Sequence, residues 1–404
     1  MKYVVIGNSA AGLFAVEEIR RRDPEGEITV LTADNVPYYS RCLTTYYLAG
    51  DIPVERLYLR PDDFAPRLGL EIAYGAEVTG LIVQSQVVLT RDGREWPYDK
   101  LLLATGASAN TLAVPGADLP EVFTLRHMSD ARAIDALIPS CREAVVVGGG
   151  LVSLKSAYAL LKRGLKVTVV VSSTRILSQM LDTHSAGHVA RHLRNHGMNI
   201  ILGADVAGIN GREHVESVTL ADGRELNAQL VITGKGVRPN TGYLAGSPIA
   251  VGQGIKVNDR LETNVPNVYA AGDVVESWDR VLERQTVNAT WPNATTQGRI
   301  AGANMAGANE QYLGSMGLNS VDFFGLSVIS AGVVKTPALA NGGSAWQVKE
   351  QWKPTGKGIP AYQRLVFKDN ILKGYVLLGD TGKAGVLTSL IREGKPYRSR
   401  VMES

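Results

Sequence analysis

Two glycine-rich turns are the parts of this sequence whose residue types and spacing point most directly to chemistry. The first follows the apolar residues 4–6 and contains Gly7, Ser9, Ala10, Ala11 and Gly12. The second follows the apolar residues 145–147 and contains Gly148, Gly150, Leu151, Val152 and Ser153. In a strand–turn–helix unit, such glycines let the backbone approach a pyrophosphate, whose charge rests on the helix N-terminus. One such turn is weak evidence, but two in one chain predict that a flavin and a nicotinamide nucleotide are bound together.

Each turn is followed by a helical stretch and a second apolar strand, where an acid often holds the adenosine ribose. After the first strand comes Asp34, which either holds a ribose or caps the following turn. After the second come Ser172 and Arg175 with no acid, which favours a 2′-phosphate and hints at NADP(H). The alternative is a decayed site that binds nicotinamide nucleotides weakly, and the choice between NAD and NADP stays open.

The composition suits a chain built from two or three domains. The sequence has 404 residues, a net charge of +3 and 45% hydrophobic residues, and this charge is too small to argue for nucleic acid. It contains no apolar run of about 18 residues, so we expect no membrane span. An apolar strand beginning at Lys2 leaves no room for a signal peptide, which predicts a cytoplasmic protein. Cys42 and Cys141 are the two cysteines, too few to hold an iron–sulfur cluster within this chain.

Four histidines recur at every fourth position, at His184, His188, His192 and His196. On a helix this spacing produces a slowly drifting stripe, and two histidines one turn apart can bind zinc. No cysteine or carboxylate completes an obvious ligand motif. We therefore predict a solvated or interdomain face and no metal site.

Several further motifs occur in a fixed order along the chain. They are Ala104-Thr105-Gly106, the second glycine turn, a stretch at 236–240 that reads Gly-Val-Arg-Pro-Asn, and Ala270-Ala271-Gly272-Asp273. In this order the chain resembles the pyridine nucleotide–disulfide oxidoreductase superfamily over essentially its whole length. Residues 37–43, 291–294, 297–299, 319–320 and 378–381 resemble the branch that contains rubredoxin reductases and the flavin module of nitrite reductase.

The resemblance implies an α/β fold with two Rossmann-like dinucleotide-binding domains, similar to glutathione reductase, and a small α+β C-terminal domain. FAD would be held by residues 1–110 together with 245–320. The NAD(P)-binding domain would be residues 111–244, and the C-terminal domain residues 321–404.

The resemblance also assigns expected roles to individual residues. Asp273, after Gly272, would hydrogen-bond the ribityl and phosphate region of FAD, and Arg41 would approach the flavin. Ala104, Thr105 and Gly106 would lie beside FAD, and Gly234 would line the second nucleotide site. The second turn departs from the family pattern because Ser153 replaces the third glycine and Lys155 replaces a glutamate.

Three functions remain open on this basis. The first is an FAD-dependent oxidoreductase that passes electrons between NAD(P)(H) and an iron–sulfur or rubredoxin-type partner. It could be the flavin subunit of a hetero-oligomeric aldehyde or 2-oxoacid oxidoreductase. The second is an NADH oxidase, peroxidase or coenzyme A–disulfide reductase, because Cys42 falls where those relatives carry a redox cysteine. The third is a non-enzymatic flavin-binding module with a degenerate nicotinamide site.

Overall fold

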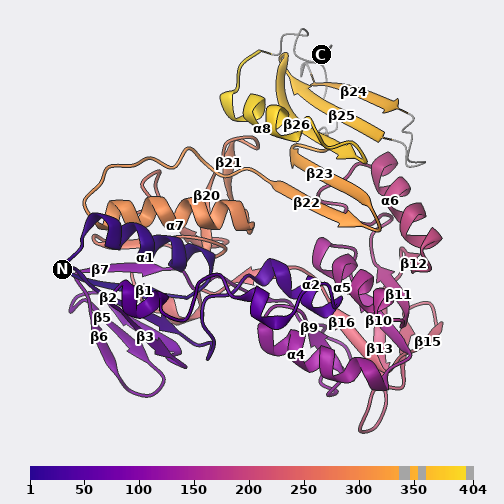
Figure 1. Cartoon of the computed structure of the whole chain (residues 1–404), viewed down its shortest axis with the longest axis horizontal. Helices are drawn as coiled ribbons and strands as arrows, with labels where there is room; N and C mark the ends of the chain where they lie inside the picture. The colour runs from indigo at the N-terminus through magenta and orange to yellow at the C-terminus, as the bar shows by residue number, and fades with distance from the viewer. Residues whose placement is uncertain (336–345, 354–360, 397–404) are drawn as a thin grey trace. The chain divides into compact units, whose positions relative to one another are not determined.

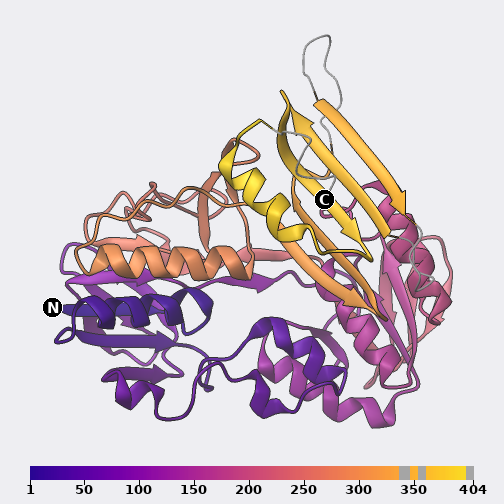
Figure 2. The ribbon, with the colours of Figure 1, turned by 45° about the horizontal axis from the view of Figure 1, so that its top comes forward.

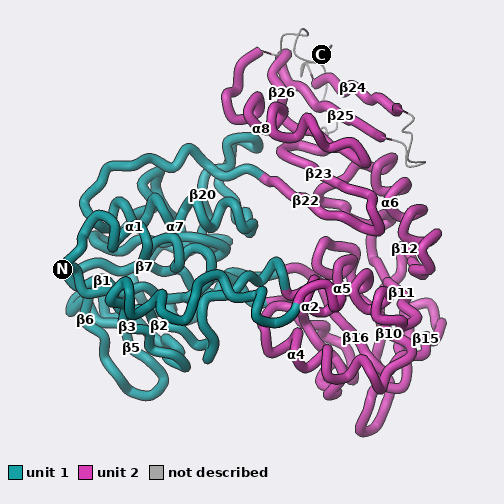
Figure 3. Tube along the Cα trace, in the orientation of Figure 1, with its two compact units in different colours: residues 1–43, 53–108, 237–316 teal, residues 44–52, 109–236, 317–404 magenta. Residues whose placement is uncertain are grey.

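The computed structural model describes residues 1–335, 346–353 and 361–396. The chain divides into two compact units (Figure 3). Unit 1 comprises residues 1–43, 53–108 and 237–316, and unit 2 comprises residues 44–52, 109–236 and 317–404. Each unit is therefore assembled from segments that are far apart in the sequence.

Unit 1 is built around a five-stranded sheet in the order β19-β7-β1-β2-β3. All its pairings are parallel. The strands are β1 (Lys2–Ile6), β2 (Glu27–Thr32), β3 (Leu70–Tyr74), β7 (Lys100–Leu103) and β19 (Val268–Ala270). Parallel sheets are covered on both faces, which explains why these strands are continuous apolar runs instead of alternating ones.

The two faces of this sheet are covered by different elements. Tyr3 and Val5 belong to one core cluster with residues of α1 (Ala10–Arg22) and α7 (Trp291–Met305). Figures 1 and 2 show these two helices side by side. Val4 and Ile6 point to the opposite face and belong to a second cluster. That cluster includes Val88 of a small antiparallel sheet made of β4 (Val78–Ile82), β5 (Val87–Thr90) and β6 (Glu95–Pro97).

Shorter elements complete unit 1 and connect its strands. The helical ones are η1 (Arg41–Leu43), η2 (Val54–Leu57), α3 (Phe64–Arg67) and η4 (Gly242–Leu244). The strands are β8 (Ala107–Ala109), β17 (Val237–Pro239), β18 (Ile255–Lys256), β20 (Val275–Asp279) and β21 (Arg284–Val287). Strand β8 pairs with β17, so the segment that leaves the first nucleotide unit lies beside the segment that returns to it.

Unit 2 repeats the same plan. Its five-stranded parallel sheet has the order β12-β11-β10-β16-β9. The strands are β9 (Val122–Thr124), β10 (Glu143–Val147), β11 (Lys166–Val171), β12 (Asn199–Leu202) and β16 (Leu230–Thr233). One face packs against α4 (Met128–Leu137) and α5 (Leu151–Lys162), and the other faces β13 (Val206–Asn210), β14 (Ser217–Leu220) and β15 (Glu225–Asn227).

Unit 2 also contains α2 (Thr44–Leu48), a short helix that lies early in the sequence. It contacts α4 and α5, and Tyr47 Oη donates to Asp135 Oδ2 at 3.0 Å. Lys162 forms an ion pair with Asp51. The helices η3 (Ile138–Ser140) and α6 (Thr183–Asn195) complete this part of the unit.

The last part of unit 2 is an antiparallel five-stranded sheet in the order β22-β23-β26-β25-β24. Its strands are β22 (Leu318–Phe323), β23 (Leu326–Gly332), β24 (Trp346–Lys353), β25 (Ala361–Lys368) and β26 (Ile371–Leu378). Helix α8 (Ala384–Glu393) lies along β26 (Figure 2). Tyr375 anchors it, because its hydroxyl contacts the Ala384 carbonyl oxygen and the Thr388 hydroxyl.

These observations confirm the predicted fold class of two Rossmann-like units with a small α+β C-terminal part. The predicted division into three domains stays a prediction, since the contacts group residues 109–236 with 317–404. Parts of the predicted 321–404 domain, at 336–345, 354–360 and 397–404, lie outside the described residues. Within the described ranges, no helix is both long enough and apolar enough to cross a membrane.

Candidate functional site

The first glycine turn joins β1 to α1 at the carboxyl edge of the parallel sheet. The Gly7 N–H donates to the Leu31 carbonyl at 2.8 Å, and Gly7 has φ +113°. A Cβ on Gly7 would overlap the carbonyl oxygen of Ala104, and a Cβ on Gly12 would overlap that of Gly7. Side chains are thus excluded where the backbone must fold tightly, leaving the first-turn N–H groups of α1 to bind an anion.

Polar contacts then fix the loop after β2. The Asn8 side chain accepts from Thr32 Oγ1 at 3.0 Å and donates to the Val36 carbonyl at 2.9 Å. Asp34 forms an ion pair with Arg41 at 2.9 Å, which brings two of the predicted site residues together. Asn8 was missed by the sequence analysis, because nothing in the fingerprint pattern identifies its position as structural.

The Gly272-Asp273 motif lies beside the first turn of α1. A Cβ on Gly272 would come within 3.0 Å of the Ala11 methyl group, and the Gly272 N–H donates to Gln297 Oε1 at 2.8 Å. Asp273 follows directly and is half-buried. The structure therefore brings Ala11, in the first turn of α1, against Gly272, although the two motifs are far apart in the sequence.

The Ala104-Thr105-Gly106 turn is held by Asn240. Asn240 Nδ2 donates to the Thr105 carbonyl at 3.0 Å, and Thr105 Oγ1 donates to the Asn240 carbonyl at 2.9 Å. Ser108 Oγ donates to Asn240 Oδ1 at 2.7 Å, and the Asn240 N–H donates to the Gly106 carbonyl at 3.0 Å. Asn240 is the last residue of the Gly-Val-Arg-Pro-Asn motif. One role of this motif is therefore to fix the Ala104-Thr105-Gly106 turn through the hydrogen bonds of Asn240.

The features of unit 1 fit an FAD. The glycine turn forms a cradle that a Cβ would fill, and Ser9, the N-cap of α1, makes no capping bond through its side chain. The Thr290 hydroxyl, at the N-cap of α7, is buried with no hydrogen-bond partner among the described residues. Buried hydroxyl groups are normally hydrogen-bonded, and a polar atom of a bound ligand would supply the missing partner.

The second glycine turn joins β10 to α5 with nearly the same geometry. The Gly148 N–H donates to the Val170 carbonyl at 2.8 Å, and Gly148 has φ +119°. A Cβ on Gly148 would crowd the carbonyl oxygen of Gly234. Ser153 is buried, and its Oγ donates to that same carbonyl oxygen at 3.2 Å. The serine in place of the third glycine is therefore accommodated.

The start of α5 is open. Gly150 is its N-cap and has no atom within 4 Å of the position of a Cβ. Val152 is 48% exposed, and Leu151 is half-buried. Lys155, one turn further, lies with its Nζ 3.5 Å from the centre of the Tyr46 ring on α2. The structure thus gives Lys155 an aromatic partner within unit 2.

The loop after β11 carries the predicted Ser172 and Arg175. Ser172 is exposed and Arg175 is half-buried. The Leu177 N–H donates to the Gly149 carbonyl at 2.7 Å, so this loop is tied directly to the glycine turn. The structure therefore brings Ser172, Arg175, Gly148, Gly150 and Gly234 to one edge of the sheet.

Cys42 lies in η1, directly before α2, and its side chain is exposed. Cys141 lies just before β10 at the other end of that strand from the glycine turn. Burial raises the pKa of the Cys141 thiol. The two cysteines are thus in different environments, and only Cys42 neighbours a predicted site residue, Arg41.

The histidine stripe on α6 contacts the C-terminal sheet. The ring of His188 lies 4.1 Å from that of Trp352, and His196 stacks on Phe324 at 4.3 Å. His192 Nε2 lies 2.9 Å from the Phe323 carbonyl oxygen. These contacts place three histidines of the stripe against the C-terminal sheet, within unit 2.

His184 is the exception in the stripe. Its ring nitrogen and oxygens of Asp182 and Glu350 lie within 4.8 Å of one another, a grouping that could hold a metal ion. However, Arg364 forms ion pairs with both carboxylates, so its guanidinium group already neutralises their negative charge.

Comparison with known proteins agrees with this geometry. Residues 1–298 match the pyridine nucleotide-disulphide oxidoreductase family, and residues 318–395 match the rubredoxin NAD+ reductase C-terminal domain. The NADH-dependent phenylglyoxylate dehydrogenase subunit epsilon of Aromatoleum evansii is 35% identical over 405 residues, covering 99% of this chain and 94% of that protein. An NADH oxidase of Methanocaldococcus jannaschii is 31% identical over 388 residues, covering 92% of this chain and 85% of that protein.

Among solved structures, an NAD-dependent persulfide reductase from A. fulgidus superposes with a TM-score of 0.91 at 25% identity. The match covers 98% of this chain and 77% of that chain. The two glycine turns have matching backbone geometry, and each lies at the carboxyl edge of its parallel sheet. The family match over residues 1–298 agrees with both observations. This chain belongs to the pyridine nucleotide-disulphide oxidoreductase family and is an FAD- and NAD(P)(H)-dependent oxidoreductase of its rubredoxin-reductase-like branch.

Proposed function

We propose that this protein passes electrons between a nicotinamide nucleotide and the iron–sulfur or rubredoxin-type centre of a partner protein, with FAD as the intermediate carrier. The observation that carries the proposal is the pairing of two glycine turns, each at the carboxyl edge of its own parallel sheet, within one chain. FAD would accept a hydride as two electrons and release them singly, which suits a one-electron acceptor.

The residues of the chain would contribute position and charge. We propose that residues 1–110 and 245–320 bind FAD, with the first turn of α1 at its pyrophosphate and Asp273 at its ribityl region. Residues 111–244 would bind the nicotinamide nucleotide at the open start of α5. Hydride transfer needs two rings held in contact, so rigid turns such as the one clamped by Asn240 serve the reaction through positioning.

The partner is inferred from the C-terminal part and from a relative. Residues 318–395 match a domain named for rubredoxin reductases, and the Aromatoleum relative is named as one subunit of a larger enzyme. Phenylglyoxylate is a 2-oxoacid, so this name supports the version in which the chain is the flavin subunit of a 2-oxoacid oxidoreductase. The chain has two cysteines, so a four-cysteine cluster must come from the partner.

Anaerobic stopped-flow absorbance tests the first half of the proposal. The FAD-loaded protein is mixed with NADH or NADPH, and we expect rapid loss of the flavin band. Gly148→Ala should slow this step at least about tenfold while FAD stays bound, because a Cβ there crowds the Gly234 carbonyl oxygen. Gly187→Ala on α6, where a Cβ meets nothing within 4 Å, is the matched control. A flavin that neither nucleotide bleaches would contradict the proposal.

The second half is tested by mixing the reduced protein with an oxidised rubredoxin or ferredoxin. We expect the flavin to be reoxidised as the acceptor's absorbance changes, at a rate proportional to acceptor concentration. Reoxidation by oxygen or peroxide alone, with no reaction with either iron–sulfur protein, would argue against the proposed partner.

A second function is favoured by one observation, the exposed Cys42 next to Arg41. The Methanocaldococcus relative is named as an NADH oxidase. In this case Cys42 would cycle between thiolate and an oxidised form. Cys42→Ser should then abolish turnover with peroxide or a disulfide while flavin reduction is retained. A long-wavelength charge-transfer band on reduction, lost in Cys42→Ser, would support this function over the first.

A further inference from the structure

We infer that Lys155 makes the nicotinamide site bind the reduced, neutral nucleotide in preference to the oxidised, cationic one. Lys155 lies on α5, one turn after the glycine turn, where the family pattern has a glutamate. The inference rests on the proposed binding of a nicotinamide nucleotide at the start of α5. It adds a selectivity for the redox state of that nucleotide.

The first argument is the side of α5 on which Lys155 lies. The strand order places β11 on one side of β10, and β16 and β9 on the other. Helix α4 joins β9 to β10 on the same face of the sheet as α5, so it covers the β16 side. Helix α2 contacts both α4 and α5, and Lys155 Nζ lies 3.5 Å from the centre of the Tyr46 ring on α2. Lys155 therefore lies on the flank of α5 that faces α4.

The second argument is the path of a dinucleotide across this edge of the sheet. The adenosine ribose lies at the end of the strand that follows the glycine-turn helix, which is β11 here. With the pyrophosphate at the start of α5, the nicotinamide half must extend to the other side, over the carboxyl ends of β16 and β9. Val152, at the open start of α5, is 48% exposed and lies one turn before Lys155 on the same helix face. A nicotinamide on this side would therefore have the Lys155 ammonium group as a neighbour.

The third argument is that the Lys155 ammonium group is held in place but not neutralised. The aromatic ring on α2 attracts the ammonium group through its electron-rich face, and this attraction leaves the net charge unchanged. Lys155 forms no ion pair with any of the described residues. The carboxylates beside these helices have cations of their own, because Asp51 pairs with Lys162 and Asp135 pairs with Arg163.

The oxidised and reduced nucleotides differ in charge at the nicotinamide ring. Hydride transfer from reduced FAD to C4 of the ring breaks one N–H bond, forms one C–H bond, oxidises the flavin and removes the positive charge of the ring. The pyrophosphate is the same in both forms, so its attraction to Lys155 cancels in the comparison. The repulsion between the ammonium group and the oxidised ring remains, and partial burial of Lys155 strengthens it. By linkage, tighter binding of the reduced form favours electron flow from the flavin to the nucleotide.

Two compounds that differ in the charge of the ring test the inference directly. Titration of the oxidised, FAD-loaded protein compares NAD+ with tetrahydro-NADH, whose ring is neutral and gives up no hydride, and we expect the neutral compound to bind more tightly. Lys155→Met should lower the ratio of the two affinities about tenfold, and Lys155→Glu should lower it further. Lys155→Arg keeps the charge and should keep the ratio within about twofold. Lys166→Met, at the amino end of β11, is the matched control and should not change the ratio.

Several outcomes would overturn the inference. It fails if Lys155→Met leaves the ratio unchanged, and also if neither compound binds. If this variant weakens both compounds equally, Lys155 acts on the pyrophosphate alone, and the inference fails too. Tyr46→Leu separates charge from packing, because it removes the ring but keeps the ammonium group, so it should keep more of the preference than Lys155→Met does. Equal losses in these two variants would show that packing alone causes the effect.

The flavin assay separates this inference from the proposed function. If NADH or NADPH bleaches the flavin in the wild type and in Lys155→Met, but the affinity ratio is the same in both, the function stands and the inference fails. If neither nucleotide bleaches the flavin, the proposed function fails, and the titration still decides whether Lys155 discriminates against the charged ring. The expected result is bleaching in both proteins, with the preference for the neutral compound reduced in Lys155→Met.

Discussion

The two glycine turns of this protein have the same backbone geometry, but their glycines stand at different positions. In both, the first glycine has positive φ, and its N–H donates to a carbonyl of the strand on one side, β2 or β11. It also lies against the carbonyl of the residue that follows the strand on the other side, β7 or β16. In unit 1 that residue is Ala104 and the third small residue is Gly12. In unit 2 that residue is Gly234 and the third residue is Ser153. The room that Gly12 provides in the first turn is provided by Gly234 in the second.

This comparison shows that a departure from the fingerprint need not mean a decayed site. A side chain at Gly12 would overlap the Gly7 carbonyl oxygen, so glycine is required there. A side chain on Gly234 would overlap Ser153 Oγ, so the glycine requirement has moved to a residue far away in the sequence. The serine then adds a hydrogen bond that a glycine could not make.

The helices that follow the turns show a second exchange. Phe14 on α1 is approached by the guanidinium groups of Arg299 at 5.2 Å and Arg60 at 5.8 Å. At the equivalent position of α5, Lys155 lies over the ring of Tyr46. The helix supplies the aromatic ring in one unit and the cation in the other, while the cation–π pairing is kept.

The largest expected effect comes from Gly12→Ala. The added methyl group overlaps a backbone carbonyl, which cannot rotate away, so we expect a loss of about 3 kcal/mol in stability and loss of bound FAD. The ratio of flavin to protein absorbance and the midpoint of urea unfolding measure these effects. Ser153→Ala, which removes only one hydrogen bond at the equivalent position, should keep FAD fully bound. Retention of FAD by Gly12→Ala would show that the first turn is less tightly packed than the structure indicates.

A smaller effect is expected from Gly234→Ala, and it can be reversed. The new methyl group meets the Ser153 hydroxyl, so we expect about 1–3 kcal/mol of destabilisation and weaker nucleotide binding. Adding Ser153→Gly should restore most of the loss, because the overlapping atom is then gone. Thermal unfolding of the two single variants and the double variant gives the coupling. Strict additivity would mean that the two positions do not compensate each other.

Loss of the Lys155–Tyr46 pair should cost less. Tyr46→Leu keeps an apolar side chain on α2 but removes the ring face, so we expect about 0.5–1 kcal/mol of destabilisation. Lys155→Met should have a similar effect, and the double variant should lose no more than one single variant does. Urea unfolding followed by far-UV circular dichroism measures all three. A double variant with the full sum of both losses would rule out a direct interaction.

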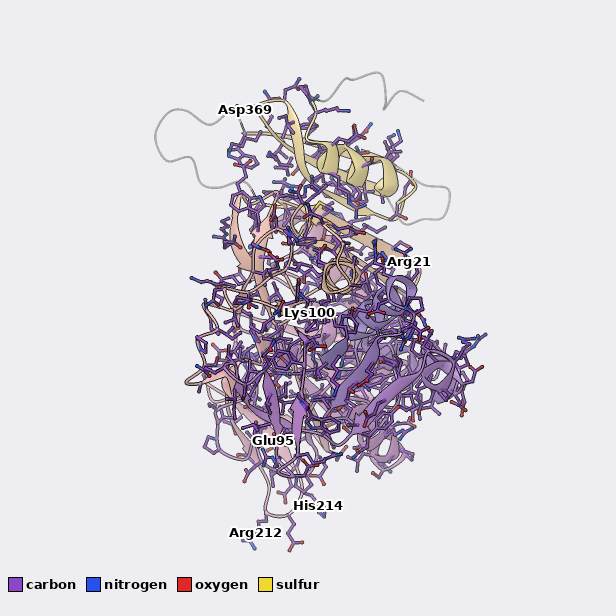
Figure 4. The ribbon with its side chains drawn as sticks, turned by 90° about the vertical axis from the view of Figure 1, so that its left-hand side faces the viewer. Arg21, Glu95, Lys100, Arg212, His214 and Asp369 are labelled. Carbon is purple, nitrogen blue, oxygen red and sulfur yellow. The ribbon has the colours of Figure 1, made fainter. Side chains whose placement is uncertain are left out.

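The smallest expected effect is on the pH dependence of stability, and it compares ion pairs near the small antiparallel sheets of the two units. In unit 1, Arg91 pairs with Glu77 where both side chains are exposed. In unit 2, Glu121 is buried and lies 2.6 Å from His214, at the tip of the β13–β14 connection (Figure 4). Burial alone would raise the pKa of Glu121, but bonds from His214 and the Val215 N–H outweigh it and lower the pKa. The bond to Glu121 raises the pKa of His214.

The signs of these shifts define a pH window. The raised histidine pKa gives stability below about pH 6.5 that is lost as pH rises through the folded-state value. The lowered glutamate pKa gives stability above about pH 4.3 that is lost as pH falls. The pair should therefore stabilise most between these limits. His214→Ala should flatten the fall in melting temperature above about pH 6.5, whereas Arg91→Ala should leave the whole pH profile unchanged.

The sequence by itself determined the local units of this protein. Apolar runs such as 4–6 and 145–147, each followed by a glycine turn, are sufficient to predict buried parallel strands and two nucleotide sites, because strand burial and tight turns depend on neighbouring residues. The order of the motifs along the chain was sufficient to predict the family, the two cofactors and a separate C-terminal part.

Only the tertiary structure decided which distant residues complete each site. Asn240 bonds to Thr105, Gly234 makes room for Ser153, and Tyr46 faces Lys155. None of these pairs is close in sequence, and no periodicity identifies one member from the other. They arise because parallel sheets bring the carboxyl ends of separate strands to one edge, where a residue's partner is set by strand order and not by chain distance.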